Sequence, residues 1–279
     1  MRSPLTRQIR RYTETVRSGW LVYRATSPVG VQLLTVLPRV LLQAIFYIGV
    51  GRLLNGTAGA TFAFVGAVAF AATSATVIAV SDVPMEDTWS DTYHRIQAGV
   101  LPPAAVHLCR AVPYAVAGML YSLAVLCVDG PLLGLTGPVR ALLALVPLYV
   151  LIAVTSAMFG LAVATLAVGG SNDVLLSNLA GYLVLAAAGV VTPLSAGLRW
   201  LAPLAGVLPV DHGLLAVRSA LAGRPWAAQA WLEAATGVGW LIMMVGLARW
   251  RDLVVRGRYP SNPVPVPGFL RRHVRRSGT

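Results

Sequence analysis

The acidic residues of this chain are few, and several of them are gathered in one short stretch. The 279 residues include 10 Asp and Glu, and four of these ten lie in the segment SDVPMEDTWSD at residues 81–91: Asp82, Glu86, Asp87 and Asp91. Carboxylates at this density are what general acid–base catalysis or a metal site would use. The segment brings no matching histidine and no second acidic motif, so it does not by itself define an enzyme.

Other catalytic side chains are scarce as well. The chain has no lysine, because all 22 residues in its Lys and Arg count are arginines. A phosphate-binding loop of the G-x-x-x-x-G-K-[ST] type needs a lysine that reaches the terminal phosphates. We therefore expect no ATPase site and no cofactor in this chain. We also expect no metal site, because the histidines are scattered without a zinc-binding spacing: His94, His107, His212 and His273.

The composition is that of a membrane protein. Hydrophobic residues make up 57% of the chain and charged residues only 11%, whereas about 25% are charged in a typical soluble domain. Four uncharged stretches reach the roughly 18 residues that indicate a spanning helix: 60–80, 111–128, 141–168 and 174–191. Two weaker ones are 29–50, which carries Arg39, and 234–248. The sequence thus predicts an all-α protein with six transmembrane helices within residues 29–250.

The distribution of arginines predicts the orientation. Six spans place both termini on one side, where 15 arginines lie, against five on the other side. Basic residues are enriched in the cytoplasmic loops of membrane proteins. We therefore expect a multi-pass protein of the plasma (inner) membrane with both termini in the cytoplasm. The acidic segment joins the second and third spans, so it is cytoplasmic too.

The two ends of the chain are predicted to be cytoplasmic segments of different kinds. Residues 1–28 place apolar side chains on one face of a helix and arginines outside it, the pattern of an interfacial helix on anionic lipid: Leu5, Ile9, Tyr12, Val16, Trp20 and Tyr23. This helix could be a simple anchor, or it could also contact a cytoplasmic partner. Residues 251–279 form a basic, proline-rich tail, for which we favour contact with lipid and expect no nucleic acid.

The acidic segment itself favours a short helix outside the membrane. Pro84 suits a first helical turn, and Glu86 and Asp87 complement the positive end of the helix dipole. Apolar and aromatic residues follow at spacings of four, four and three: Met85, Trp89, Tyr93 and Ile96. We therefore predict one amphipathic helix over residues 85–96, with aromatics on one edge and exposed acids on another. The alternative is a loop whose aromatics fold back on the spans while its acids are solvated.

Two segments resemble the permeases of the ABC-2 type (type-2 ABC exporter) family. The first is EDTWSDTYHRIQAGVLPPAAVHLCRAVPY, which resembles the family's cytoplasmic coupling helix between spans 2 and 3. The second is VVTPLSAGLRWLAPLAGVLPVDHGLLAVRSAL at residues 190–221, which resembles the outer re-entrant short helices between spans 5 and 6. The positions that carry the second likeness are Pro193, Leu194, Ser195, Trp200, Leu201, Leu208, Pro209, Gly213 and Arg218.

The resemblance implies a permease that works with other subunits. Two permeases, the same chain or a paralogue, would pair with two cytoplasmic ABC ATPase subunits that bind ATP and Mg. The residues implied to contact the ATPase are Met85, Glu86, Asp87, Trp89, Asp91, Tyr93 and Ile96. Export would pass between the permeases along spans two and five, with a lining drawn from Thr73, Ser74, Thr76, Ser171, Asn178 and Tyr182. For each of these, hydrogen bonding between or within helices is the alternative.

The cargo is expected to be a lipophilic small molecule, an antibiotic or a lipid. No loop is long enough for a carbohydrate-binding domain, and the sequence offers no chain of mid-membrane acids for a proton-driven pump. The same family includes polysaccharide exporters, so a glycan stays a possibility. Two readings of other classes also stay open: a membrane-embedded enzyme acting on lipid or peptide, and a membrane anchor for a cytoplasmic complex. A neighbouring ATPase gene would favour the transporter over both.

Overall fold

The protein is an all-α membrane protein. The computed structural model describes residues 3–90, 92–168, 173–193 and 199–258, and for a few of these, including Trp89 and Tyr93, it describes the backbone only. The described residues form helices and contain no strand. Four helical segments are long and apolar enough to cross a membrane: Val29–Asp87, Pro103–Leu132, Val146–Ala167 and Ala227–Leu253. Val174–Ala187 is a shorter apolar helix.

The helices follow one another with short connections. The α-helices are α1 (Pro4–Thr26), α2 (Val29–Val31), α3 (Leu37–Thr73), α4 (Asp82–Trp89), α5 (Tyr93–Gln97), α6 (Pro103–Ala124), α7 (Gly130–Leu132), α8 (Thr136–Ala144), α9 (Val146–Ala167), α10 (Asp173–Ala187), α11 (Ala202–Ala205), α12 (Asp211–Leu221) and α13 (Ala227–Arg258). Tighter or wider helical turns lie between them: π-helical Gln32–Val36, Ser74–Ile78 and Val125–Asp129, and 3₁₀-helical Ala79–Ser81 and Arg199–Leu201.

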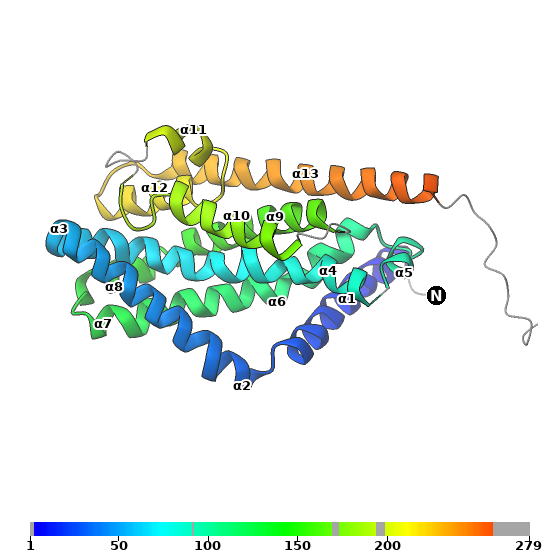
Figure 1. The fold of residues 1–279 in the computed structure, drawn as a ribbon, viewed down its shortest axis with the longest axis horizontal. Helices are drawn as coiled ribbons and strands as arrows, with labels where there is room; N and C mark the ends of the chain where they lie inside the picture. The colour runs from blue at the N-terminus through cyan, green and yellow to red at the C-terminus, as the bar shows by residue number, and fades with distance from the viewer. Residues whose placement is uncertain (1–2, 91, 169–172, 194–198, 259–279) are drawn as a thin grey trace, which may run out of the picture.

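The chain reverses direction within α3. Asn55 and Gly56 have non-helical backbone angles, and Gly56 has a φ of 58°, which glycine adopts without strain. The rings of Tyr47 and Phe70 lie 5.8 Å apart, although 23 residues of straight helix would separate them by about 35 Å. Residues 37–54 and 57–73 are therefore two antiparallel limbs, and the turn between them lies at one end of the molecule (Figure 1).

The second limb of α3 runs through the middle of the bundle. Its residues from Ala63 to Thr73 are all buried. Glycines on its neighbours allow close packing: an added Cβ would lie 2.6 Å from the Ala72 carbonyl oxygen at Gly118 of α6, and 2.5 Å from the Thr76 carbonyl oxygen at Gly160 of α9. Small residues at such contacts are what helix association in membranes relies on. This limb leads directly through Ser81 into α4.

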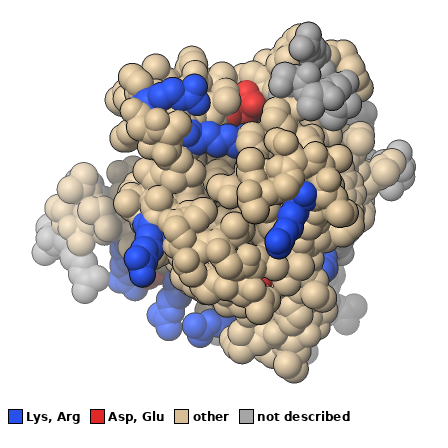
Figure 2. Space-filling view, turned by 90° about the vertical axis from the view of Figure 1, so that its left-hand side faces the viewer, with Lys and Arg blue, Asp and Glu red and all other residues tan. Residues whose placement is uncertain are grey.

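The two ends of the bundle carry different short elements (Figure 1). The α4–α5 end holds α4, α5, the start of α1 and the last turns of α13, whereas the α12 end holds the α3 turn, α7, α11 and α12. Figure 2 faces the α12 end, whose surface is mostly uncharged with a few arginines. The elements that the sequence singled out, namely the acidic segment and the short helices at 199–221, therefore lie at opposite ends.

The N-terminal segment is helical, as predicted, and its apolar stripe is divided. Leu5 and Ile9 are exposed, at 67% and 56% of their surface. Farther along, Tyr23 is buried and its ring lies 4.8 Å from that of Tyr114 on α6. Only the first half of the stripe is thus free to meet a lipid surface, while the second half packs on the bundle.

Three boundaries differ from the sequence prediction. The acidic segment forms two helices, α4 and α5, and not one helix over 85–96. The break follows Trp89, where the N–H of Thr92 bonds the Asp87 carbonyl oxygen at 2.8 Å and the Thr92 carbonyl oxygen starts α5. The Thr92 hydroxyl also lies 3.4 Å from the Asp87 carbonyl oxygen, and side-chain bonds of this kind are the reason that Thr and Ser favour caps and turns. The stretch 141–168 is divided at Leu145 between α8 and α9, and α13 continues to Arg258.

Candidate functional site

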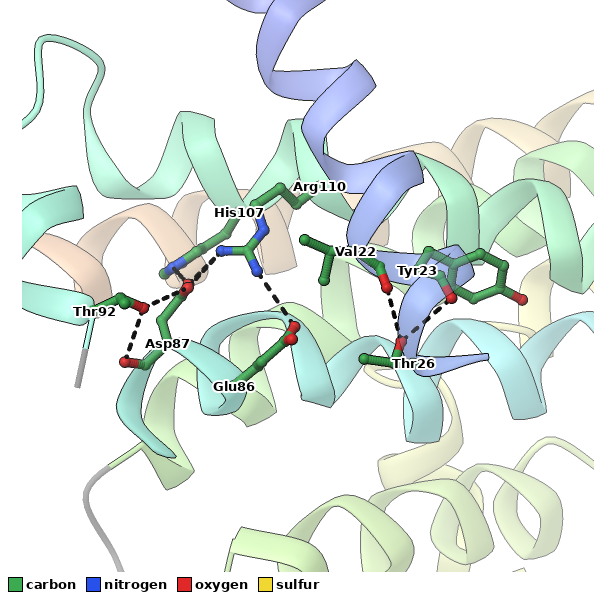
Figure 3. Close-up of polar contacts among 8 residues, drawn as sticks. All are labelled: Val22, Tyr23, Thr26, Glu86, Asp87, Thr92, His107 and Arg110. Atoms are coloured by element: carbon green, nitrogen blue, oxygen red, sulfur yellow. Dashed lines mark hydrogen bonds and ion pairs between the residues drawn. The ribbon is translucent and has the colours of Figure 1, made fainter. Parts of the chain in front are cut away.

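A buried ion pair joins the acidic segment to α6. One guanidinium nitrogen of Arg110, Nη1, lies 2.6 Å from each carboxylate oxygen of Asp87, and Nη2 lies 3.5 Å from Oε2 of Glu86 (Figure 3). Only 5% of Asp87 and 9% of Arg110 are exposed. Charge-assisted hydrogen bonds of this length are among the strongest in proteins. Arg110 therefore fixes α4 against α6.

Further side chains complete the surroundings of Asp87. His107 lies one helical turn before Arg110 on α6, and its Nε2 is 3.7 Å from Asp87 Oδ2. The Thr92 hydroxyl lies 3.4 Å from both the carbonyl oxygen and Oδ1 of Asp87. Residues three apart on a helix share a face, so α6 presents His107 and Arg110 together. We call these five residues the Arg110 cluster: Glu86, Asp87, Thr92, His107 and Arg110.

The N-terminal helix packs directly on the Arg110 cluster. A Cβ added at Gly19 of α1 would lie 2.8 Å from the Cα atom of Arg110. Because position 19 has no side chain, α1 can approach the backbone of α6 at Arg110, the residue that pairs with Asp87 of α4. Figure 3 shows the next turns of α1, from Val22 to Thr26, beside the cluster. The three cytoplasmic elements expected from the sequence, α1, α4 and the start of α6, are thus one packed unit.

A groove opens beside this unit, between α1 and the segment that connects α5 to α6. Its volume is about 630 Å³, and its lining includes Arg11 and Glu14 of α1, Arg95 of α5 and Val100. Glu14 is already paired with Arg10 at 2.7 Å. Among the described residues, neither Arg11 nor Arg95 has an ion-pair partner. The groove therefore offers positive charge to whatever enters it.

The structure places the predicted coupling residues in different surroundings. Asp87 and Met85 are buried, and Met85 packs against Ala164 and Ala167 of α9. Glu86 and Ile96 are half-buried. The expectation that the acids form an exposed edge is therefore wrong for Asp87, because Asp87 forms a buried ion pair with Arg110. The side chains of Trp89 and Tyr93 and the whole of Asp91 lie outside the described residues, so their contact with an ATPase stays a prediction.

The residues predicted to line a path are divided between the interior and the surface. Thr73 and Thr76 are fully buried, and each hydroxyl donates to a backbone carbonyl oxygen four residues earlier at 3.0 Å. The Ser74 hydroxyl likewise donates to the Ala71 carbonyl oxygen. Hydrogen bonding within a helix is the alternative to a lining role for these residues. On α10, Asn178 donates to the Val174 carbonyl oxygen at 2.9 Å, and Tyr182 is 60% exposed. Ser171 lies outside the described residues, and the lining role of this whole set stays a prediction.

The second resembling segment forms short helices, as expected. In it, Pro193 and Trp200 are exposed and Pro209 is buried. Arg218 donates from Nη2 to the Gly189 carbonyl oxygen at 2.9 Å, and its guanidinium carbon lies 3.6 Å from the centre of the Phe62 ring. Leu194 and Ser195 are not among the described residues. The position of these helices outside the membrane is a prediction that the structure leaves untested.

Sequence reasoning missed two buried acids. Glu233 on α13 and Asp129 at the end of the α6 segment are 0% exposed, and both lie in helices apolar enough to span a membrane. An acid in such a helix is costly unless it is paired or functional, which is the signal that would have found them. Among the described residues, no group of three or more His, Cys, Asp or Glu side chains could hold a metal ion.

One comparison with known proteins identifies a family. The family model described as ABC-2 type transporter matches residues 15–222, which is most of the chain. The chain therefore belongs to the ABC-2 type transporter family, whose members are the membrane subunits of ABC transporters. It is an integral membrane protein. No curated protein and no solved structure matches it.

Proposed function

We propose that this chain is the permease subunit of an ATP-driven exporter, energised by separate ATPase subunits. The observation that carries the proposal is the packed unit of α1, α4 and α6 around Arg110, because it joins the surface that we expect to be cytoplasmic to α6, which packs on the central limb of α3. The lack of any lysine supports ATP binding by a partner chain, together with its Mg.

The proposed membrane layout has six crossings. The reversal at Asn55 supports two crossings within Val29–Asp87, and α10, although only 15 residues long, supplies a fifth between α9 and α13. Exposed Tyr182 and neighbouring Asn178 are unusual on a lipid-facing helix. They favour a second permease copy or paralogue across α10, with the export path between the two.

The proposed ATPase contact is the α4–α5 end. The groove with Arg11 and Arg95 fits an acidic surface on the ATPase, and Trp89 and Tyr93 would supply apolar contact, which contributes more than exposed ion pairs do. The exposed Leu5 and Ile9 leave the first turns of α1 free for anionic lipid. A cargo that is a lipophilic small molecule, an antibiotic or a lipid fits a bundle with many large apolar side chains exposed on its described surface.

Co-purification tests the proposal directly. The permease should co-purify with a candidate ABC ATPase subunit, and the complex should hydrolyse ATP faster when lipophilic cargo candidates are added. The permease alone should show neither hydrolysis nor saturable binding of ATP, because it has no lysine with which to form a phosphate-binding loop. Nucleotide hydrolysis that persists in the fully separated permease would contradict the division of labour between two subunits.

Topology gives an independent prediction. In a variant without Cys109 and Cys127, a cysteine at Ser3 or Ser277 should resist an impermeant thiol reagent in intact cells, whereas one at Ala222 should react. The reason is the excess of arginines on the side of the termini. Permeabilised cells, in which all three positions should react, provide the control. Reaction at Ser3 in intact cells would mean that the proposed orientation is inverted.

A further inference from the structure

A buried carboxylate of α13 holds the beginning of α12. Glu233 is 0% exposed. Its Oε1 accepts the N–H of Val210 at 3.0 Å, and its Oε2 accepts the N–H of Gly213 at 2.9 Å. The hydroxyl of Thr155, on α9, donates to Oε1 as well. We call these four residues the α12 anchor: Thr155, Val210, Gly213 and Glu233.

The carboxylate of Glu233 caps the N-terminal end of α12. Val210 is the residue before the first turn of α12, and no side chain of this segment caps that turn. The N–H groups of the cap position and of the third helical residue are the ones that a capping box satisfies, and a negative charge there complements the helix dipole. Here a single carboxylate from another helix takes both roles. The start of α12 is therefore tied to α13 by charge-assisted bonds.

The held conformation is strained. Val210 has a φ of 87°, in the left-handed region that β-branched residues avoid. Among the described residues it is the one non-glycine with a positive φ. Such strain persists only where the surroundings enforce it, and it is found often at switches and gates. The hydrogen bonds to Glu233 hold Val210 in this conformation. Their loss would therefore allow the turn at Val210 to relax and α12 to move.

The other end of α12 holds two further elements. Arg218, in its last turn, bonds the Gly189 carbonyl oxygen after α10 and stacks on Phe62 of the second limb of α3. Ahead of the start of α12, α13 makes another bond from the Trp240 indole N–H to the Val207 carbonyl oxygen at 2.8 Å. Thus α12 connects α3, α9, α10 and α13 at the end of the bundle away from the Arg110 cluster (Figure 1).

We propose that Glu233 is a positioning residue of a gate at this end of the permease: its carboxylate holds α12 closed across the ends of α3 and α10, and release of α12 opens the exit for cargo. The inference rests on the proposed export function, which assigns a cargo exit to this end. Its first test does not depend on export, so the two can fail separately.

The first test measures how often α12 opens. In the permease without Cys109 and Cys127, reconstituted in nanodiscs, a cysteine at Ala216 would report on the buried face of α12, because Ala216 is 0% exposed. Reaction with a thiol reagent should be at least about tenfold faster in Thr155→Val and Glu233→Gln, since each loses a hydrogen bond to a charged group. A cysteine at exposed Ala222 should react at one rate in every variant.

Thr165→Val is the matched control. Thr165 is also a buried threonine of α9, but its hydroxyl donates to the Leu161 carbonyl oxygen of its own helix at 2.7 Å. The labelling rate at position 216 should be the same in Thr165→Val as in the unmodified protein. If the labelling rate at position 216 is the same in Thr155→Val and Thr165→Val, and both variants are folded, then the α12 anchor does not hold α12 in place. The comparison of Thr155→Val with Thr165→Val decides the question even if Glu233→Gln does not fold.

The second test links the anchor to transport. In the complex with the ATPase, the labelling rate at position 216 should rise while ATP is hydrolysed and fall back when ATP is exhausted. In Glu233→Gln it should already be high without ATP. A complex that hydrolyses ATP while labelling stays constant would overturn the gate, whereas failure to find any ATPase partner would instead remove the proposed function and leave the first test valid.

Discussion

Arg110→Ala should lower the free energy of unfolding of the permease by about 3–5 kcal/mol. Removal of one partner of a buried ion pair leaves the other charge without compensation, and Asp87 is buried with Arg110 as its closest cation. The variant should melt at a markedly lower temperature in detergent and reach lower abundance in the membrane. Thermal unfolding of the purified protein, with abundance measured by immunoblot, checks both.

Two variants make the result specific. Arg10→Ala removes an arginine whose pair with Glu14 is exposed on both sides, so it should cost about 0–1 kcal/mol. The double variant Asp87→Leu with Arg110→Met should recover most of the stability, because an apolar pair can replace a buried ion pair at little cost. If Arg110→Ala unfolds at the temperature of Arg10→Ala, Arg110 does not hold α4 in place.

The double variant also separates stability from coupling. If the Arg110 cluster serves only to keep the fold, the stable double variant should associate with the ATPase normally. If it positions α4 and α5 for the ATPase, as we propose, association or cargo-stimulated hydrolysis should stay impaired although the melting temperature has returned. The measurement is co-purification yield at equal permease abundance.

Much of the fold follows from composition alone. Long uncharged stretches require backbone hydrogen bonds to be satisfied within the segment, which in a membrane means helices. The predicted stretches 60–80 and 174–191 accordingly fall on the second limb of α3 and on α10. The break inside the acidic segment was not predictable from side-chain spacing. A period of four, four and three fits one continuous helix, whereas the turn depends on local hydrogen bonds made by Thr92.

The chemistry of the site depended on contacts between distant residues. Asp87 and Arg110 are 23 positions apart and on different helices, so the sequence predicted an exposed Asp87 on the edge of a helix and did not pair it with Arg110. Similarly, no partner for Glu233 could be predicted from the sequence, because the two backbone N–H groups whose hydrogen bonds it accepts come from the start of α12, at least 20 positions away. Sequence patterns report the period of an element, but partners for buried charges are chosen by tertiary packing.

Gly66→Ala should separate the second limb of α3 from the end of α10 and abolish most transport. A Cβ at position 66 would lie 1.9 Å from the carbonyl oxygen of Val190 and 2.7 Å from its carbonyl carbon. Both are backbone atoms, so neither can turn aside as a flexible side chain would. Overpacking of this kind typically costs about 1–3 kcal/mol, and here the relaxation must move whole helices.

Gly49→Ala provides the comparison, because Gly49 lies on the other limb of α3 and an added Cβ there meets no atom within 4 Å. In that variant the methyl group should leave the melting temperature unchanged or raise it slightly, since alanine favours a helix over glycine by about 0.5–1 kcal/mol. Gly66→Ala should have a lower melting temperature. In the complex it should lose cargo-stimulated ATP hydrolysis, because the second limb of α3 and α10 are the proposed walls of the export path. Equal behaviour of the two variants would mean that the contact between Gly66 and Val190 is not part of the working structure, and that the path must be formed by other helices.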